Sequence, residues 1–165
     1  MSAILIILLA ILFSAFFSGM EIAFISSNRL RLELDIKQGG VGSGILKFFS
    51  RNPGQYIASM LVGNNIALVV YGIFFTRLVN PLMAPFLGSD IVVLIVNTVI
   101  STAIILVTGE FLPKNTIIIA PNFFLKALSF PTLLFFWLFY PVSKFALLIS
   151  NLLLRIIPGR HKIRI

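Results

Sequence analysis

Val107-Thr108-Gly109-Glu110-Phe111-Leu112-Pro113-Lys114 is the stretch around which the chain is organised, and it closes an uncharged run that begins at Ile91. As a helix, the run from Ile91 to Gly109 would be ~28 Å long, which is close to the thickness of a bilayer core. A carboxylate at the end of such a run is costly to insert and is by default a functional candidate. The stretch therefore predicts a membrane-spanning helix that carries a functional Glu110.

Pro113 adds a backbone break beside this carboxylate. Proline has no N–H, so the carbonyl oxygen of Gly109, four residues earlier, loses its helical donor. In a membrane such a carbonyl must be buried in protein or line a cavity, and two hard oxygens there suit Mg²⁺, Ca²⁺ or Na⁺ better than a soft metal. The alternative is a structural ion pair between Glu110 and Lys114, one helical turn apart.

Composition places the whole chain in a membrane. Its 165 residues are 59% hydrophobic and 11% charged, with a mean hydropathy of +1.07, whereas soluble domains carry roughly 25% charged residues. There are no cysteines, which excludes disulfides and thiolate chemistry. The lone His161 lies in a basic tail and is expected to be solvated. The net charge is +8, and the basic residues stand beside apolar runs. Positive-inside orientation and contact with anionic lipids therefore explain the charge better than nucleic-acid binding does.

The first predicted span covers residues 2–27. Near its end, Ser18 and Glu21 are three residues apart and share a helix face, and Gly19 would let another backbone approach closely. They are candidates for a polar site inside the membrane. Alternatively, the serine bonds back to its own helix and Glu21 is solvated near the interface.

A second span is predicted for residues 55–77, without charge as far as Thr76, after a basic segment at 28–53 that is expected to be cytoplasmic. The span contains Asn64 and Asn65, whose amides need partners inside a membrane. Adjacent residues point ~100° apart on a helix, so we expect one of the two to face a site as a carbonyl ligand while the other packs. Hydrogen bonding between helices is the structural alternative.

The third span is predicted for residues 90–112, after a short outside link at 77–90. Its polar residues Asn97, Ser101 and Thr102 are expected to hold helices together. A further apolar stretch at 121–157 contains Pro131 and Pro141. If it crossed the membrane once, the basic tail would lie opposite the basic segment at 28–53, against the positive-inside rule.

We therefore expect an all-α integral membrane protein with three transmembrane helices, the N-terminus outside the cell and the C-terminus in the cytoplasm. Proline-broken juxtamembrane helices at about 121–157 would form a belt in the inner leaflet. A complete hairpin through the membrane would also preserve sidedness, but two spans in so short a stretch is a less favourable arrangement.

At this point the residues resemble a known family. Phe17-Ser18-Gly19-Met20-Glu21, Ser27-Asn28-Arg29-Leu30, Leu61-Val62-Gly63-Asn64-Asn65 and Gly109-Glu110-Phe111-Leu112-Pro113-Lys114 are similar, in order, to motifs of the transmembrane domain of the CorC/CNNM (cyclin M) family. The similarity covers nearly the whole chain. The combination of the Phe-Ser-Gly element with Gly-Glu-x-x-Pro-Lys is more specific than either element alone.

The resemblance implies Mg²⁺ transport, with export, coupled to Na⁺, as the prevailing view. It implies a homodimer in the cell membrane, with cytoplasmic CBS domains in full-length members. No such domains are found in this chain, which we expect to be the membrane domain alone. By motif position, the resemblance implies a cation site with five residues and two secondary candidates: Ser18, Asn64, Asn65, Gly109 and Glu110, then Glu21 and Lys114.

Two other classes of function fit parts of the same pattern. A membrane anchor that dimerises a cytoplasmic sensor would use the same polar groups for packing alone. An intramembrane enzyme would need a nucleophile with a base, and without a buried histidine or any cysteine only Ser18 with Lys114 could serve. We therefore predict that the chain is not an enzyme.

Overall fold

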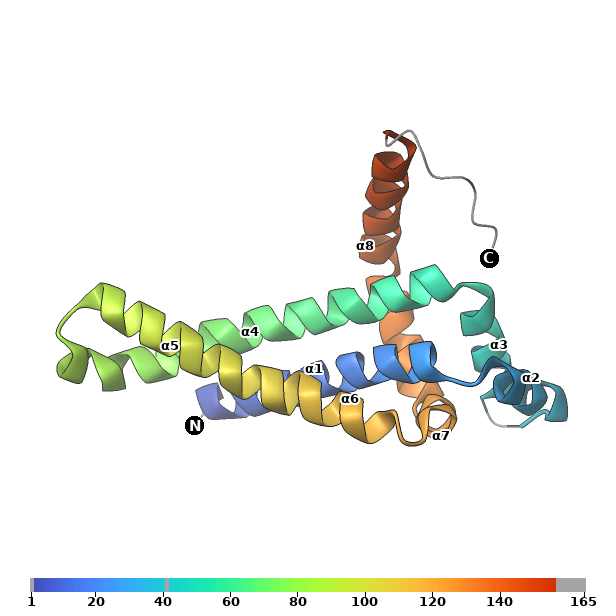
Figure 1. Cartoon of the computed structure of the whole chain (residues 1–165), viewed down its shortest axis with the longest axis horizontal. Coiled ribbons are helices and arrows are strands. Elements are labelled where there is room, and N and C mark those ends of the chain that lie inside the picture. Colours follow the sequence, from blue (N-terminus) through green and yellow to red (C-terminus); the bar gives the residue numbers. More distant parts are fainter. Residues whose placement is uncertain (1, 41, 157–165) are drawn as a thin grey trace.

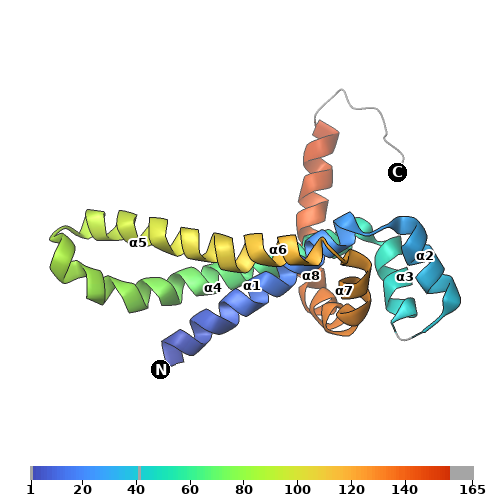
Figure 2. The same ribbon diagram turned by 60° about the horizontal axis from the view of Figure 1, so that its bottom comes forward.

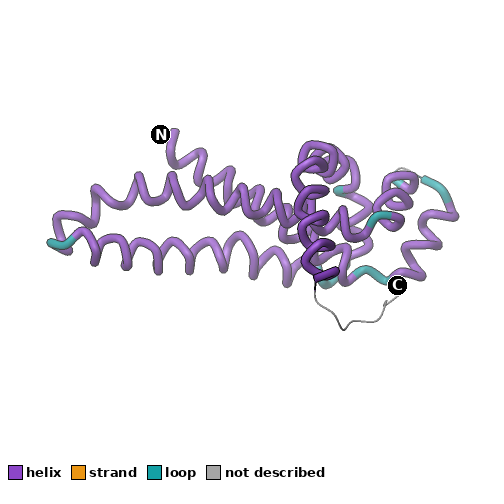
Figure 3. Tube along the Cα trace, turned by 90° about the horizontal axis from the view of Figure 1, so that it is seen from above, coloured by secondary structure: helices purple, strands orange, loops and turns teal. Residues whose placement is uncertain are grey.

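The computed structural model describes residues 2–40 and 42–156, and Figure 3 shows that these residues form helices and loops without strands. Four of the helical stretches are long and apolar enough to cross a membrane: Ser2–Ser26, Pro53–Phe86, Asp90–Ile117 and Ser129–Leu153. The all-helical membrane architecture predicted from the sequence is thus confirmed, with one more candidate span than predicted.

The first part of the chain forms one long helix and two short ones. Helix α1 covers Ser2–Ser26, α2 covers Arg29–Gln38 and α3 covers Ser43–Arg51. The side chain of Asn28 caps α2 by accepting a hydrogen bond from the N–H of Arg31 at 3.1 Å. Left-handed Gly42, at φ 89°, begins α3, so α2 and α3 form a compact hairpin beside the end of α1 (Figure 1).

Helix α4 runs over Pro53–Leu87 and is 35 residues long, or ~52 Å at the usual rise per residue. The sequence had predicted a span ending at residue 77, but the helix continues through Pro81 and Pro85 and ends at left-handed Gly88. Each proline removes only one backbone hydrogen bond. The Nδ2 of Asn97 donates to the Oδ1 of Asn80 at 2.6 Å, which ties this part of α4 to α5 (Asp90–Ile105) and confirms that Asn97 holds helices together.

After α5 the same rod continues as a π-helical turn, η1 (Leu106–Phe111), and then as α6 (Leu112–Ile117). Helix α7 (Pro121–Ala127) follows and packs against α1 and α3. Figures 1 and 2 show that α1, α4 and the rod from α5 to α6 run along the long direction of the molecule.

Helix α8 (Ser129–Ile156) runs across this direction (Figures 1 and 2). It is unbroken at Pro141, contrary to the predicted break, and the chain is interrupted only at Leu128 between α7 and α8. Side chains of α4 hold that turn of α8. The Nε2 of Gln55 donates to the carbonyl of Tyr140 at 3.2 Å, and Ser59 bonds the hydroxyl of Ser143 at 2.9 Å. The basic tail from residue 157 lies outside the described residues, as does His161.

Two apolar clusters fill the interior. The larger lies where α1, α3, α4, α7 and α8 meet, and includes Phe17, Phe49, Tyr56 and Phe136. The smaller joins α1, α4 and α5.

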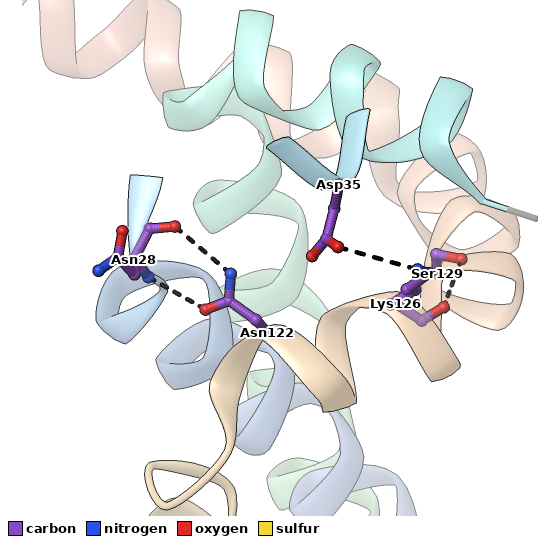
Figure 4. A network of polar contacts seen from close by, with 5 residues as sticks. All are labelled: Asn28, Asp35, Asn122, Lys126 and Ser129. Carbon is purple, nitrogen blue, oxygen red and sulfur yellow. Dashed lines mark hydrogen bonds and ion pairs between the residues drawn. The ribbon is translucent and has the colours of Figure 1, made fainter. Parts of the chain in front are cut away.

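Polar contacts attach α7 to α2, as Figure 4 shows. The Asn28 N–H donates to the Oδ1 of Asn122 at 3.1 Å, and the Nδ2 of Asn122 donates back to the Asn28 carbonyl at 3.4 Å. Nearby, Lys126 Nζ lies 3.9 Å from the carboxylate of Asp35. These contacts join the first helical hairpin to the segment that follows η1 and α6.

Candidate cation site

Two serines lie one helical turn apart on the buried side of α1. Ser14 and Ser18 are both fully buried. The Ser14 hydroxyl donates to the Oδ1 of Asn64 at 2.7 Å, whereas the Ser18 hydroxyl has no hydrogen-bond partner in the described part of the chain. A buried hydroxyl without a partner costs free energy, so Ser18 is the side chain here that would gain from a ligand.

The two asparagines of α4 separate as their helical spacing requires. Asn64 is 5% exposed and faces α1, whereas Asn65 is on the exposed surface. The neighbouring Gly63 lies against aromatic rings: a Cβ there would meet Phe17 at 2.8 Å and Phe139 at 2.9 Å. Gly63 therefore allows ring packing, and Asn64 is the asparagine that reaches the interior.

The backbone of η1 explains how the third segment takes part. The N–H of Leu112 donates to the carbonyl of Val107, five residues earlier, instead of to Thr108, four residues earlier. Pro113 has no N–H to offer. The carbonyls of Thr108 and Gly109 thus both lose their α-helical donors, and such π turns occur often at functional sites. The sequence predicted the loss at Gly109 but not at Thr108.

Gly109 brings η1 directly onto α1. It is buried, and a Cβ at this position would lie 2.9 Å from the Oγ and 3.3 Å from the Cβ of Ser14. Ser14 also bonds Asn64, so one small polar group joins α1, α4 and η1. Ser14 was missed from the sequence, although it stands four residues before Ser18 and therefore on the same helix face.

The carboxylate of Glu110 lies elsewhere. Its side chain is 31% exposed and is 3.8 Å from Lys114 Nζ, a distance too long for a hydrogen bond. Glu110 also lines a groove of ≈ 280 Å³ between α4 and α5, together with Tyr71, Ser101 and Thr102. Within the described residues, no hydrogen bond or ion pair joins Glu110 to Ser18 or Asn64, so the structure brings together Gly109, Ser14 and Asn64 but not the carboxylate.

Glu21 is partly exposed on α1, beyond the two serines. Over residues 2–40 and 42–156, no group of three or more histidine, cysteine or acidic side chains gathers as a metal cluster. The groups that meet are the Ser14 hydroxyl, the Asn64 amide and the backbone of Gly109. Hard cations that keep some of their water suit such a set.

Comparison with known proteins decides the family. The cyclin M (CNNM) transmembrane N-terminal domain matches residues 4–164. The chain belongs to this family. Its CNNM domain is a multi-pass membrane domain, and the family is not a family of enzymes.

Two curated relatives are similar to this CNNM domain. The uncharacterized protein Rv1841c of Mycobacterium tuberculosis is 29% identical over 170 residues, which cover 98% of this chain and 48% of that protein. The UPF0053 inner membrane protein YfjD of Escherichia coli is 30% identical over 109 residues, which cover 66% of this chain and 24% of that protein. The chain thus spans about half, or less, of the length of the relatives it matches.

Proposed function

We propose that this CNNM domain transports Mg²⁺ across the cell membrane, as an exporter coupled to Na⁺. The observation that carries the proposal is the π turn η1, in which the Thr108 and Gly109 carbonyls lack their α-helical donors. Gly109 packs this turn onto α1 at Ser14, which bonds Asn64. Non-helical backbone at membrane depth is tolerated where it is buried or lines a pathway, and transporters use such interrupted helices to bind ions.

The ion would be held between α1, α4 and η1. Mg²⁺ takes six oxygens at about 2.1 Å and dehydrates reluctantly, so neutral ligands from Ser18, Asn64 and Gly109 would be completed by waters. The charge would come from Glu110, which lines the groove between α4 and α5. In an alternating-access cycle, rotation or straightening of η1 would bring the carboxylate to the ion, and the reverse movement would release it.

We further propose three membrane crossings by α1, α4 and the α5–α6 rod, with the N-terminus outside and the α2–α3 hairpin in the cytoplasm. The crosswise direction of α8 supports its place along the inner leaflet (Figure 1). The exposed Trp137 and Phe145 and the lysine Lys144 suit an interfacial position there. The working unit would be a homodimer, with cytoplasmic CBS domains in the full-length protein.

A membrane anchor that only dimerises a sensor is the second candidate. The Glu110–Lys114 pair favours it, because two charges that neutralise each other on one helix need no ion. Under this alternative, the polar residues inside the domain would only hold helices together, as the hydrogen bond between Asn97 and Asn80 does.

Calorimetric titration of Mg²⁺ into the purified protein separates the two functions. Glu110→Gln keeps the shape of the side chain and removes its charge, so we expect it to fold and to lose Mg²⁺ affinity by roughly tenfold or more. Ser18→Ala and Asn64→Ala should weaken binding less, because water can replace a neutral ligand, and Glu21→Gln should have the mildest effect.

Asp35→Asn is the matched control, since it removes one negative charge from α2. It should bind Mg²⁺ as the unaltered protein does. Equal affinity in Glu110→Gln and the unaltered protein would leave the anchor as the better account.

A further inference from the structure

A cavity of ≈ 350 Å³ lies apart from the cation site, where α1 ends, α4 begins and the α2–α3 hairpin folds over both. Phe24, Leu32 and Ile57 give it an apolar wall, and Arg29, Glu33 and Ser50 give it a polar one. Both α1 and α4 are candidate membrane spans, so their ends place this cavity at headgroup depth.

The polar wall carries one positive and one negative group. Arg29 and Glu33 are four residues apart on α2, a spacing that permits an ion pair. Within residues 2–40 and 42–156 they form none with each other or with another side chain. Their charged groups are therefore both free to meet a ligand that carries the opposite charges.

We propose that this cavity binds a zwitterionic phospholipid headgroup, with the phosphate at Arg29 and the ammonium group at Glu33. The hydroxyl of Ser50 is available to a phosphate or glycerol oxygen, and the start of the acyl chains would pack against Phe24 and Ile57. This proposal does not depend on the cation site. An anionic headgroup without an amine would satisfy Arg29 but would leave Glu33 facing a second negative group.

The apolar wall argues for a lipid instead of free phosphate. Inorganic phosphate could pair with Arg29, but it would gain nothing from Phe24, Leu32 and Ile57, and it would be repelled by Glu33. A phospholipid carries an ammonium group for Glu33 and acyl chains for the apolar wall, so it would contact both walls of the cavity.

Native mass spectrometry tests the proposal on the whole chain, with equal amounts of phosphatidylethanolamine and phosphatidylglycerol offered in detergent. We expect the unaltered protein to retain phosphatidylethanolamine preferentially. Glu33→Gln should lower that preference about threefold to fivefold, and Arg29→Gln should lower the retention of both lipids by a similar factor. Glycerophosphoethanolamine and inorganic phosphate, added separately, should each displace little of the bound lipid.

The controls are Arg31→Gln and Asp35→Asn, which remove the same charges from α2 but lie outside the cavity lining. They should leave both retention and preference unchanged. Equal retention of the two lipids by the unaltered protein would overturn the proposal. So would equal losses in the cavity variants and their controls, or displacement of the lipid by phosphate alone.

Discussion

At the scale of single residues, the contact between Gly109 and Ser14 sets how closely η1 can approach α1 at the candidate cation site. There is no room for a side chain at Gly109, because a Cβ would lie only 2.9 Å from the Oγ of Ser14. The serine cannot turn away without losing its bond to Asn64. The size of one side chain therefore decides whether α1, α4 and η1 can meet.

We expect Gly109→Ala to lower the free energy of unfolding by about 1–3 kcal/mol and to weaken Mg²⁺ binding, because α1 must move away from η1. Thermal unfolding in detergent and calorimetry measure the two effects. Gly54→Ala, in the first turn of α4, is the matched control, since a Cβ there would meet nothing within 4 Å and Gly54 lies outside the groove that Glu110 lines. An unchanged unfolding temperature in Gly109→Ala would contradict the packing described here.

Sequence reasoning found part of this constellation. It singled out Ser18 as a polar residue in an apolar run, and it gave Gly109 a role because Pro113 removes the donor to its carbonyl. Helical geometry predicted that only one of the two asparagines would face inward. It missed Ser14 and the Thr108 carbonyl. The partner of Ser14 depends on how α1 is rotated against α4, and the Thr108 carbonyl loses its donor through a shifted backbone hydrogen bond. Residue spacing predicts neither of these features. The position of Glu110 relative to Ser18 was missing for the same reason.

At the scale of elements, proline had opposite consequences in different helices. The sequence predicted breaks at Pro131 and Pro141, and it predicted that the second span would end before Pro81 and Pro85. Instead, α4 runs through Pro81 and Pro85, and α8 has Pro131 in its first turn and runs through Pro141. In α8, Gln55 and Ser59 of α4 bond the neighbours of Pro141, the Tyr140 carbonyl and the Ser143 hydroxyl. At Pro113 the chain instead takes up an extra residue in the preceding turn, where Gly109 leaves room for it. Tertiary support, absent from the local sequence, decides which outcome occurs.

Pro113→Ala should convert η1 toward an ordinary α-helix, because alanine restores the missing N–H donor. We expect the free energy of unfolding to rise by up to about 3 kcal/mol while Mg²⁺ affinity falls. Pro81→Ala is the control, since it restores a donor in α4 near its far end and should raise stability without changing Mg²⁺ affinity. If Pro113→Ala binds Mg²⁺ as tightly as the unaltered protein, the π turn has no part in holding the ion.

At the scale of the whole molecule, hydropathy alone does not decide how many helices cross the membrane. The stretch Ser129–Leu153 is as eligible by length and composition as the other three. The charge distribution and the crosswise course of α8 (Figure 2) are independent arguments for three crossings. The charge distribution bears on how the chain inserts into the membrane, whereas the course of α8 reflects how the helices pack.

Single cysteines test this topology without background, because the chain contains no cysteine of its own. We expect an impermeant thiol reagent applied to intact cells to label Ser2→Cys and Ser89→Cys. Ser43→Cys should be labelled only after the membrane is opened, as should Gly159→Cys in the tail outside the described residues. Labelling of Ser43→Cys from outside would overturn the proposed orientation.

Assembly is tested by light scattering of the purified domain in detergent. We expect a dimer, because three spans are too few to enclose a pathway and the groove that Glu110 lines is open on one side of a single copy. The mass should stay at two chains as the protein is diluted over a wide range. A monomer at every concentration would contradict this expectation.

Through the two hydrogen bonds between Asn28 and Asn122, α7 connects α6 to the start of α2. Both bonds involve the same two residues, so they hold or release together, and only Ile118–Ala120 separate α7 from α6. Such a short connector has little slack. A displacement of α6 must therefore either break these two hydrogen bonds or move α2 with it, so the α2–α3 hairpin would respond to a movement of the α5–α6 rod.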